Sequence, residues 1–448
     1  MAEPSELTRQ VGLRSAYALV VANMIGAGIF TTTGFQAQAL GDPAAIYGLW
    51  ILGGVLALCG ALCYSELGAA MPHAGGEYVY LREAFGGAFA FMSALVSLTA
   101  GFSAPIASAL ESLVRYGGQF FPVLGEGRTV AGGLGLNDLV AVALAWVLVG
   151  AHAFRMQAGL QFNDWITAFK VTGIVVILLA AAAVGQGDAA GLLRASAALE
   201  PEGPARVAAF ATSLVFVMFC YSGWNSAAYL AGELRDPQRT LPRALLLGTG
   251  TVTVLYLGLN LVYFYGAPVE ALAGKVEVGL VASRGLFGEV GVSAVTLVLT
   301  VSLLASASAM TLAGPRVYWA VGRDTPALRF LTVTRPDGTP LRSLVLQGLV
   351  TTVVILLGRV DQIMQYAGFT LSLFASLAVA SLIVLRIRRP ELERPFRVRA
   401  YPLPPLLFLG VSLWMMFWAF QGRPVESTLG LLTVAVGGVA YGLTRDRR

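Results

Sequence analysis

Uncharged stretches about as long as a membrane is thick recur along the whole chain. Twelve segments carry almost no Asp, Glu, Lys or Arg, and each approaches the ~20 residues that a helix needs to cross ~30 Å of hydrocarbon. We therefore predict an all-α integral membrane protein with twelve transmembrane helices. Their expected cores are residues 15–33, 45–64, 87–110, 139–153, 165–184, 207–231, 244–269, 290–319, 343–358, 363–385, 403–421 and 427–443.

Composition agrees with this pattern. Hydrophobic residues make up 56% of the 448 residues and charged residues only 12%, against roughly 25% charged residues in ordinary soluble domains. The segments between the predicted spans are too short to bury a core of their own. We therefore expect a single membrane domain over residues 1–448.

The positive charges predict an orientation. Most of the 30 lysines and arginines fall on one side of the predicted membrane, with clusters at residues 235–243, 323–342 and 386–399. Cytoplasmic loops carry such an excess, so we expect a multi-pass protein of the plasma or inner membrane with both termini cytoplasmic. The net charge of +5 then reflects topology, and nucleic-acid binding is a poor explanation of it.

Catalytic and metal-binding patterns are missing from the sequence. Cys59, Cys63 and Cys220 lie inside predicted spans, and His73 and His152 are far apart, so no disulfide framework or metal-ligand spacing is visible. An enzyme would need a nucleophile with a base, or metal ligands, and a channel would need rings of carbonyls or charges. We expect neither, and no cofactor.

Two predicted spans are interrupted by glycine. The first contains NMIGAGIF at 23–30 and the sixth contains FCYSGWN at 219–225. These segments open two units of five spans, residues 15–184 and 207–387, and two more spans follow at 403–443. Such paired interruptions mark the binding site in inverted-repeat transporters.

An interruption leaves backbone groups without helical partners inside the membrane, which costs several kcal/mol per group. A ligand can satisfy them: amides at a helix start suit a carboxylate, and carbonyls at a helix end suit an ammonium. An amino acid carries both groups. From glycine spacing alone, however, close helix packing is the better explanation of Gly26, Ala27 and Gly28.

Four motifs, in order along the chain, resemble one transporter family. NMIGAGIF at 23–30 closely resembles the first-helix motif of the amino acid, polyamine and organocation (APC) superfamily, and PHAGGEYVYLREAFG at 72–86 resembles its loop between helices two and three. YSGWN at 221–225, followed by ELRDPQRTLP at 233–242, resembles the sixth-helix motif of the L-type amino acid transporter (LAT) branch. RPFRV at 394–398 resembles the loop after helix ten.

The resemblance implies a leucine-transporter-type fold, with a 5+5 inverted repeat plus two extra helices, and alternating access around a central site. By position, the substrate site would comprise residues of the two interruptions: Met24, Gly26, Ala27, Gly28, Phe219, Cys220, Ser222 and Gly223. The amides of Ala27 and Gly28 would bind the substrate carboxylate. The carbonyls of Met24, Phe219 and Ser222 would bind its ammonium, and the Phe219 ring would be a gate.

The chain departs from the family pattern at two places. Ala27 stands where many relatives have serine, which removes a hydroxyl but keeps the backbone amide. The loop at 115–136 has no cysteine, whereas the animal heteromeric members have one there that joins a heavy chain. We therefore expect no disulfide-linked heavy chain; the sequence does not indicate the oligomeric state.

Lys170 lies within the fifth predicted span. An ionisable side chain at that depth is costly and by default marks function; the alternative is that its long stem reaches an interface. In the resembled family, a lysine here occupies the place of sodium in sodium-coupled relatives. Its ammonium would bridge the first helix near Gly26 and a hydroxyl of helix eight, with Ser302 the expected partner. Whether Lys170 changes protonation is open.

The sequence also bears on the substrate. No Asp or Glu lies at mid-depth in a predicted span, since Glu66 and Glu111 lie at span ends, and a cationic side chain would require a buried carboxylate. Asn225 stands where some basic-amino-acid exchangers of the superfamily have glutamate. We expect sodium-independent transport of neutral L-amino acids, by exchange or proton symport; the alternative is a proton-coupled permease for cationic amino acids or amines.

Overall fold

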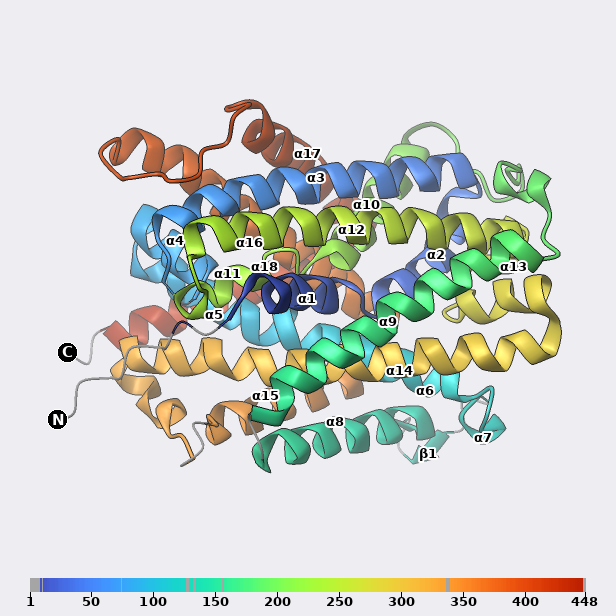
Figure 1. Cartoon of the computed structure of the whole chain (residues 1–448), viewed down its shortest axis with the longest axis horizontal. Coiled ribbons are helices and arrows are strands. Elements are labelled where there is room, and N and C mark those ends of the chain that lie inside the picture. The colour runs from blue at the N-terminus through green and yellow to red at the C-terminus, as the bar shows by residue number, and fades with distance from the viewer. Residues whose placement is uncertain are drawn as a thin grey trace.

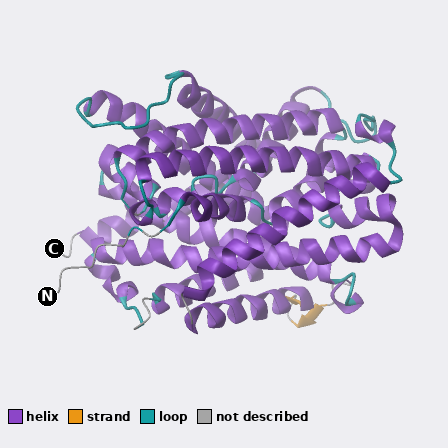
Figure 2. Ribbon diagram, in the orientation of Figure 1, coloured by secondary structure: helices purple, strands orange, loops and turns teal. Residues whose placement is uncertain are grey.

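Helices make up almost all of the protein (Figures 1 and 2). The computed structural model describes residues 9, 11–73, 75–125, 129–131, 134–154, 157–335 and 339–445. Within these residues the strands are β1 (Thr129–Ala131) and β2 (Leu134–Gly135), which pair antiparallel. The expected helical membrane architecture is confirmed.

Eleven helical segments of the described chain are long and apolar enough to cross a membrane, and α15 is an apolar helix of 17 residues. The long helices are α1 (Leu13–Met24), α2 (Ala27–Leu40), α3 (Pro43–Ala70), α5 (Gly87–Val96), α6 (Ala104–Gly117), α8 (Leu136–Phe154), α9 (Gln157–Val184), α10 (Gly203–Tyr221), α12 (Pro237–Gly266), α14 (Val278–Asp324), α15 (Leu341–Leu357), α16 (Val360–Arg388), α17 (Leu403–Gly422) and α18 (Pro424–Arg445). Short helices connect some of them: α4 (Glu77–Phe85), α7 (Pro122–Gly125), α11 (Ser226–Tyr229) and α13 (Val269–Leu272).

The predicted spans coincide with these helices and differ mainly at their ends. An uncharged stretch ends at the first arginine, whereas the helix itself can continue past that arginine into the membrane interface. The α12 helix therefore begins at Pro237 and not near 244. In α14 (Val278–Asp324) two helices meet at Gly288, and the apolar span after this point begins at Gly291, beside the expected start at residue 290. The backbone of α14 bends at Gly288, whose φ of 63° favours glycine.

Most of the long helices run along the long axis of the bundle, while α9 crosses it obliquely (Figure 1). The α12 helix packs along both α1 and α3, α14 packs along α6, and α10 contacts α2, α3, α16 and α17. Glycine permits close approach at these contacts: a Cβ at Gly248 of α12 would lie 2.6 Å from the Val20 side chain of α1. Such small residues are typical of helix contacts in membranes.

A buried carboxylate joins three segments at one end of the bundle. Glu66 of α3 is only 1% exposed. It accepts hydrogen bonds from Arg386 of α16 (2.8 Å) and from the backbone N–H of Val398 (2.7 Å), and Arg394 lies 3.5 Å away. Two guanidinium groups and an amide thus compensate the burial of one negative charge. Arg394 and Val398 belong to the RPFRV motif, so this motif fixes the chain after α16.

We predict that Glu66→Gln strongly destabilises the protein. The substitution leaves Arg386 and Arg394 without their buried counter-charge, and breaking such a buried pair costs about 3 kcal/mol or more. The melting temperature of the purified protein in detergent measures the effect. The matched control is Glu83→Gln, because Glu83 pairs with Arg389 (2.8 Å) at a partly exposed site, where a pair contributes about 1 kcal/mol or less. Equal melting temperatures for the two variants would contradict the prediction.

Candidate functional site

The two glycine interruptions lie against each other. The first separates α1 from α2 at Ile25 and Gly26, and the second separates α10 from α11 at residues 222–225. A Cβ at Gly28 would lie 2.4 Å from Sγ and 3.1 Å from Cα of Cys220. A Cβ at Gly223, whose φ is +96°, would lie 3.0 Å from the backbone of Asn23. Each glycine therefore admits the backbone of the other interruption, so close packing and a ligand site are compatible explanations.

Side chains from three other helices donate hydrogen bonds to the last carbonyl groups of α1. Met24 O accepts a hydrogen bond from the Tyr256 hydroxyl (2.5 Å), and Ile25 O accepts from both Lys170 Nζ (2.7 Å) and Ser306 Oγ (2.6 Å). Ala22 O also accepts from Lys170 (3.4 Å). The last carbonyls of a helix have no partner within it, and inside a membrane water cannot replace one. These contacts make an interruption of α1 tolerable.

Lys170 is buried at 1% exposure, so its side chain does not reach an interface. Its three contacts, Ala22 O, Ile25 O and Ser306 Oγ (2.8 Å), match the three N–H groups of an ammonium. The bridge from helix five to the first interruption is thus present.

The expectation that Ser302 provides the hydroxyl that contacts Lys170 is wrong. The Ser302 hydroxyl donates to Val298 O of its own helix (2.7 Å), and Ser306 contacts Lys170 in its place. The two serines are four residues apart, which is about one turn or ~6 Å along α14. Both serines lie on the same face of α14. The sequence indicates this face, but it does not indicate at which turn of the helix the contact with Lys170 is made.

The second interruption is held in part by its own serine. Ser222 donates from its backbone N–H (3.0 Å) and its hydroxyl (2.6 Å) to the carbonyl of Phe219. That carbonyl was expected to bind an ammonium, so the Ser222 hydroxyl would have to turn away first. Cys220 O accepts from Tyr256 (3.0 Å), the same hydroxyl that contacts Met24 O. Tyr256 therefore joins the two interruptions, a role that the sequence did not indicate.

The start of α2 presents backbone amides. Ala27 and Gly28 are the first residues of this helix, and its N-cap, Gly26, has no side chain with which to cap them. Amides of a first helical turn have no carbonyl acceptor within the helix, and they lie at the positive end of the helix dipole. This is an environment suited to a carboxylate.

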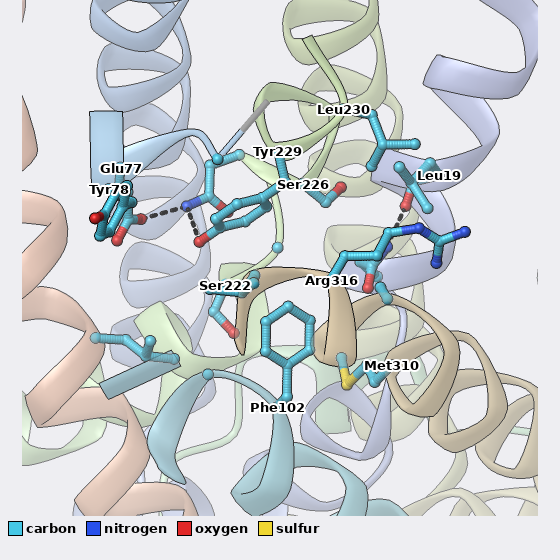
Figure 3. Close-up of a pocket in the computed structure, with 18 of the residues that line it drawn as sticks. Leu19, Glu77, Tyr78, Phe102, Ser222, Ser226, Tyr229, Leu230, Met310 and Arg316 are labelled. Atoms are coloured by element: carbon cyan, nitrogen blue, oxygen red, sulfur yellow. Dashed lines mark hydrogen bonds between the residues drawn. The ribbon is translucent and has the colours of Figure 1, made fainter. Parts of the chain in front are cut away.

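A cavity of about 450 Å³ lies beside the second interruption (Figure 3). Its walls include Asn23 of α1, Phe102 near α6, and Met310 of α14. Two of the predicted substrate residues, Ser222 and Gly223, line it. The others lie beyond its lining: Met24, Gly26, Ala27, Gly28, Phe219 and Cys220. The structure thus places the predicted residues near one another, but the residues that were expected to bind the carboxylate, Ala27 and Gly28, lie outside the cavity lining.

One buried carboxylate in the cavity wall was missed by the sequence analysis. Glu77, only 7% exposed, accepts hydrogen bonds from the Tyr64 hydroxyl (2.8 Å) and from Asn225 Nδ2 (2.5 Å). Burial raises the pKa of Glu77, and these hydrogen bonds partly offset that rise. Only carboxylates within spans were considered, whereas Glu77 begins α4 and folds back against the second interruption (Figure 3). The signal in the sequence that could have pointed to Glu77 is its place in the PHAGGEYVY motif.

Comparison with known proteins gives consistent matches over nearly the whole chain. A family model described as amino acid permease matches residues 11–440. The b(0,+)-type amino acid transporter 1 of Mus musculus is 26% identical over 98% of this chain and 88% of its own. The cystine/glutamate transporter of Homo sapiens is 27% identical (98% and 86% covered). The large neutral amino acids transporter small subunit 2 of Rattus norvegicus is 28% identical (97% and 80% covered).

The contact between the interruptions predicts that Gly28→Ala destabilises the protein while Gly26→Ala does not. The added methyl at 28 meets Cys220 at 2.4 Å, whereas at 26 the nearest atom, Ser306 Oγ, is 3.8 Å away. Overpacking of this kind costs about 1–3 kcal/mol. Thermal unfolding of the purified variants measures it, and Cys220→Ala should partly rescue Gly28→Ala by removing Sγ. Equal tolerance at the two positions would refute this packing model.

The serine contacts predict a difference between Ser306→Ala and Ser302→Ala. The Ser306 hydroxyl donates a hydrogen bond to Ile25 O and accepts one from Lys170. Its loss should lower the free energy of unfolding by about 1–3 kcal/mol. Loss of the Ser302 hydroxyl removes a bond within one helix only, so little change is expected. Thermal unfolding in a single detergent compares the two variants. A larger loss for Ser302→Ala would show that Lys170 is held differently.

Proposed function

The chain belongs to the amino acid permease family, as an amino-acid transporter of the LAT branch of the APC superfamily, and we propose that it carries neutral L-amino acids without sodium. Transport proceeds by alternating access, as exchange or proton symport. The observation that carries this proposal is the contact of Lys170 with the end of α1.

Lys170 supplies the argument against sodium coupling. Its ammonium contacts Ala22 O, Ile25 O and Ser306 Oγ, a set of oxygen ligands that a hard cation would also choose. The Lys170 ammonium at this place makes a sodium ion there both unnecessary and, while the lysine is protonated, electrostatically unfavourable. The interruption is therefore held by the protein's own cation.

The interruptions supply the argument for the amino-acid site. The amides of Ala27 and Gly28 bind the substrate carboxylate, and the carbonyls of Met24, Phe219 and Ser222 bind the ammonium. Support comes from the contact of Gly28 with Cys220 and of Gly223 with Asn23, which brings a helix start beside a helix end. Phe219 covers the bound substrate, as a gate.

The two interruptions also support the repeat organisation. We assign residues 15–184 and 207–387 to two inverted repeats and residues 403–443 to two additional helices. The interrupted helix opens each repeat. The cavity lining includes Glu77, in the connection between α3 and α5, and Pro340, in the connection between α14 and α15. With both termini cytoplasmic, we assign both connections, and with them the cavity, to the cytoplasmic side. No heavy chain is joined by a disulfide, because the loop at 115–136 has no cysteine.

One observation favours the alternative, a proton-coupled permease for cationic amino acids or amines. Glu77 is a buried carboxylate in the cavity wall, and none of the ion pairs among the described residues includes it. A cationic side chain could supply the missing charge. We favour neutral substrates because Tyr64 and Asn225 already donate to the carboxylate.

We predict that proteoliposomes with the full chain exchange leucine, alanine and serine when choline replaces sodium, and that arginine is not taken up. Counterflow of each labelled amino acid, with and without a pH gradient, measures the substrate and the coupling. Uptake of arginine or an amine alone would support the alternative and overturn the neutral assignment.

The two lysines of the chain provide the control for this experiment. Lys170→Ala removes the cation that holds α1, so counterflow should fall at least about tenfold while the protein still inserts. Lys275→Ala changes an exposed lysine between α13 and α14 and should leave counterflow unchanged. Normal turnover by Lys170→Ala would remove the main support for the proposed mechanism.

A further inference from the structure

Two residues of opposite charge line the cavity in addition to the residues of the second interruption. Arg316 comes from α14 and Glu233 from the turn at Ala231–Glu233, and both lie in the cavity wall. Neither forms an ion pair within 4.0 Å in the part of the chain that the structure describes, although the charge of Glu233 acts on Arg316. Figure 3 shows Arg316 on the side of the cavity opposite Glu77 and Tyr78.

Arg316 has unused hydrogen-bonding capacity. Its Nη1 donates to Leu312 O of the same helix (2.8 Å), and a guanidinium has five N–H donors in a planar fork that matches a carboxylate. An unpaired charge within a membrane helix is costly and usually marks a substrate path. The Glu233 carboxylate provides the complementary charge for an ammonium. A zwitterionic amino acid carries both groups that this pair lacks.

Arg316 is well separated from Lys170 and from the end of α1 that Lys170 contacts. Arg316 follows Ser306, the partner of Lys170, by ten residues, which is ~15 Å along α14. The cavity volume of about 450 Å³ lies in the range of small-molecule sites, about 300–1,000 Å³. The start of α2 is outside the cavity lining, whereas Arg316 and Glu233 lie within it.

We propose that the cavity contains a second amino-acid site, in which Arg316 binds the carboxylate and Glu233 binds the ammonium. This site rests on the proposed transport function and extends it: it holds the amino acid between the cavity mouth and the interruptions. Zwitterionic amino acids bind there, whereas amines without a carboxylate do not.

The test counts bound leucine by equilibrium dialysis with the full chain in lipid nanodiscs. The wild type should bind two leucine molecules per chain at saturation. Arg316→Gln and Glu233→Gln should each bind one with unchanged affinity and weaken the second site at least about tenfold, as expected for a lost charge-assisted bond. Isoamylamine, which is leucine without its carboxylate, should not displace the second leucine.

The matched control is Arg323→Gln. Arg323 lies seven residues after Arg316 on the same face of α14, stacks on the Trp319 ring (5.1 Å), and is not part of the cavity lining. This variant should bind two leucine molecules. Using two separate charge variants guards against the failure of one of them to fold.

The outcomes separate the second site from the transport proposal. A wild type that exchanges leucine but binds one molecule per chain overturns the second site and leaves the transport function intact. Two bound molecules in both Arg316→Gln and Glu233→Gln also overturn it, as does displacement of the second leucine by inorganic phosphate at the same concentration. Absence of both counterflow and binding overturns the transport proposal itself.

Discussion

The structure depends on how the carbonyl end of α1 is satisfied in the middle of a membrane. A helix that stops there exposes backbone oxygens that neither lipid nor a continuing helix can pair. Lys170, Ser306 and Tyr256, from three different helices, donate to these oxygens. The interruption and its binding potential exist because these side chains replace the missing helical partners. The positions of α9, α12 and α14 around α1 follow from the same requirement.

The membrane architecture could be predicted from the sequence because hydrocarbon imposes a simple rule on length and charge. In the described chain, eleven of the twelve expected spans correspond to helices long enough to cross a membrane, and the ninth corresponds to α15, an apolar helix of 17 residues. The ends were less predictable, as at Pro237 of α12, because arginine tolerates the interface. The interruptions could be recognised because glycine occurs at corresponding places in two spans, at Gly26 and Gly28 and at Gly223, and because both segments resemble family motifs.

The sequence indicated the segments that form the candidate site, but it did not indicate which side chains contact one another there. Ser302 and Ser306 share one face of α14, and only the packing of α14 against α1 determines that Ser306 is the residue that contacts Lys170. The role of Tyr256 could not be predicted, since a tyrosine in an apolar span is usually a core residue. Glu77 lies in a connection between spans, where its place in the PHAGGEYVY motif was a signal of importance, but hydropathy alone does not show that this connection folds into the cavity wall. Long-range contacts of this kind depend on tertiary structure.

The Tyr256 hydroxyl has a consequence for motion. It lies 2.5 Å from Met24 O and 3.0 Å from Cys220 O, yet a hydroxyl has a single hydrogen to donate. The two carbonyls therefore compete for one proton, and the shorter distance favours Met24. A small displacement of α1 relative to α10 would allow the hydroxyl to turn from one carbonyl to the other, so that Tyr256 would keep one hydrogen bond to an interrupted helix in either position.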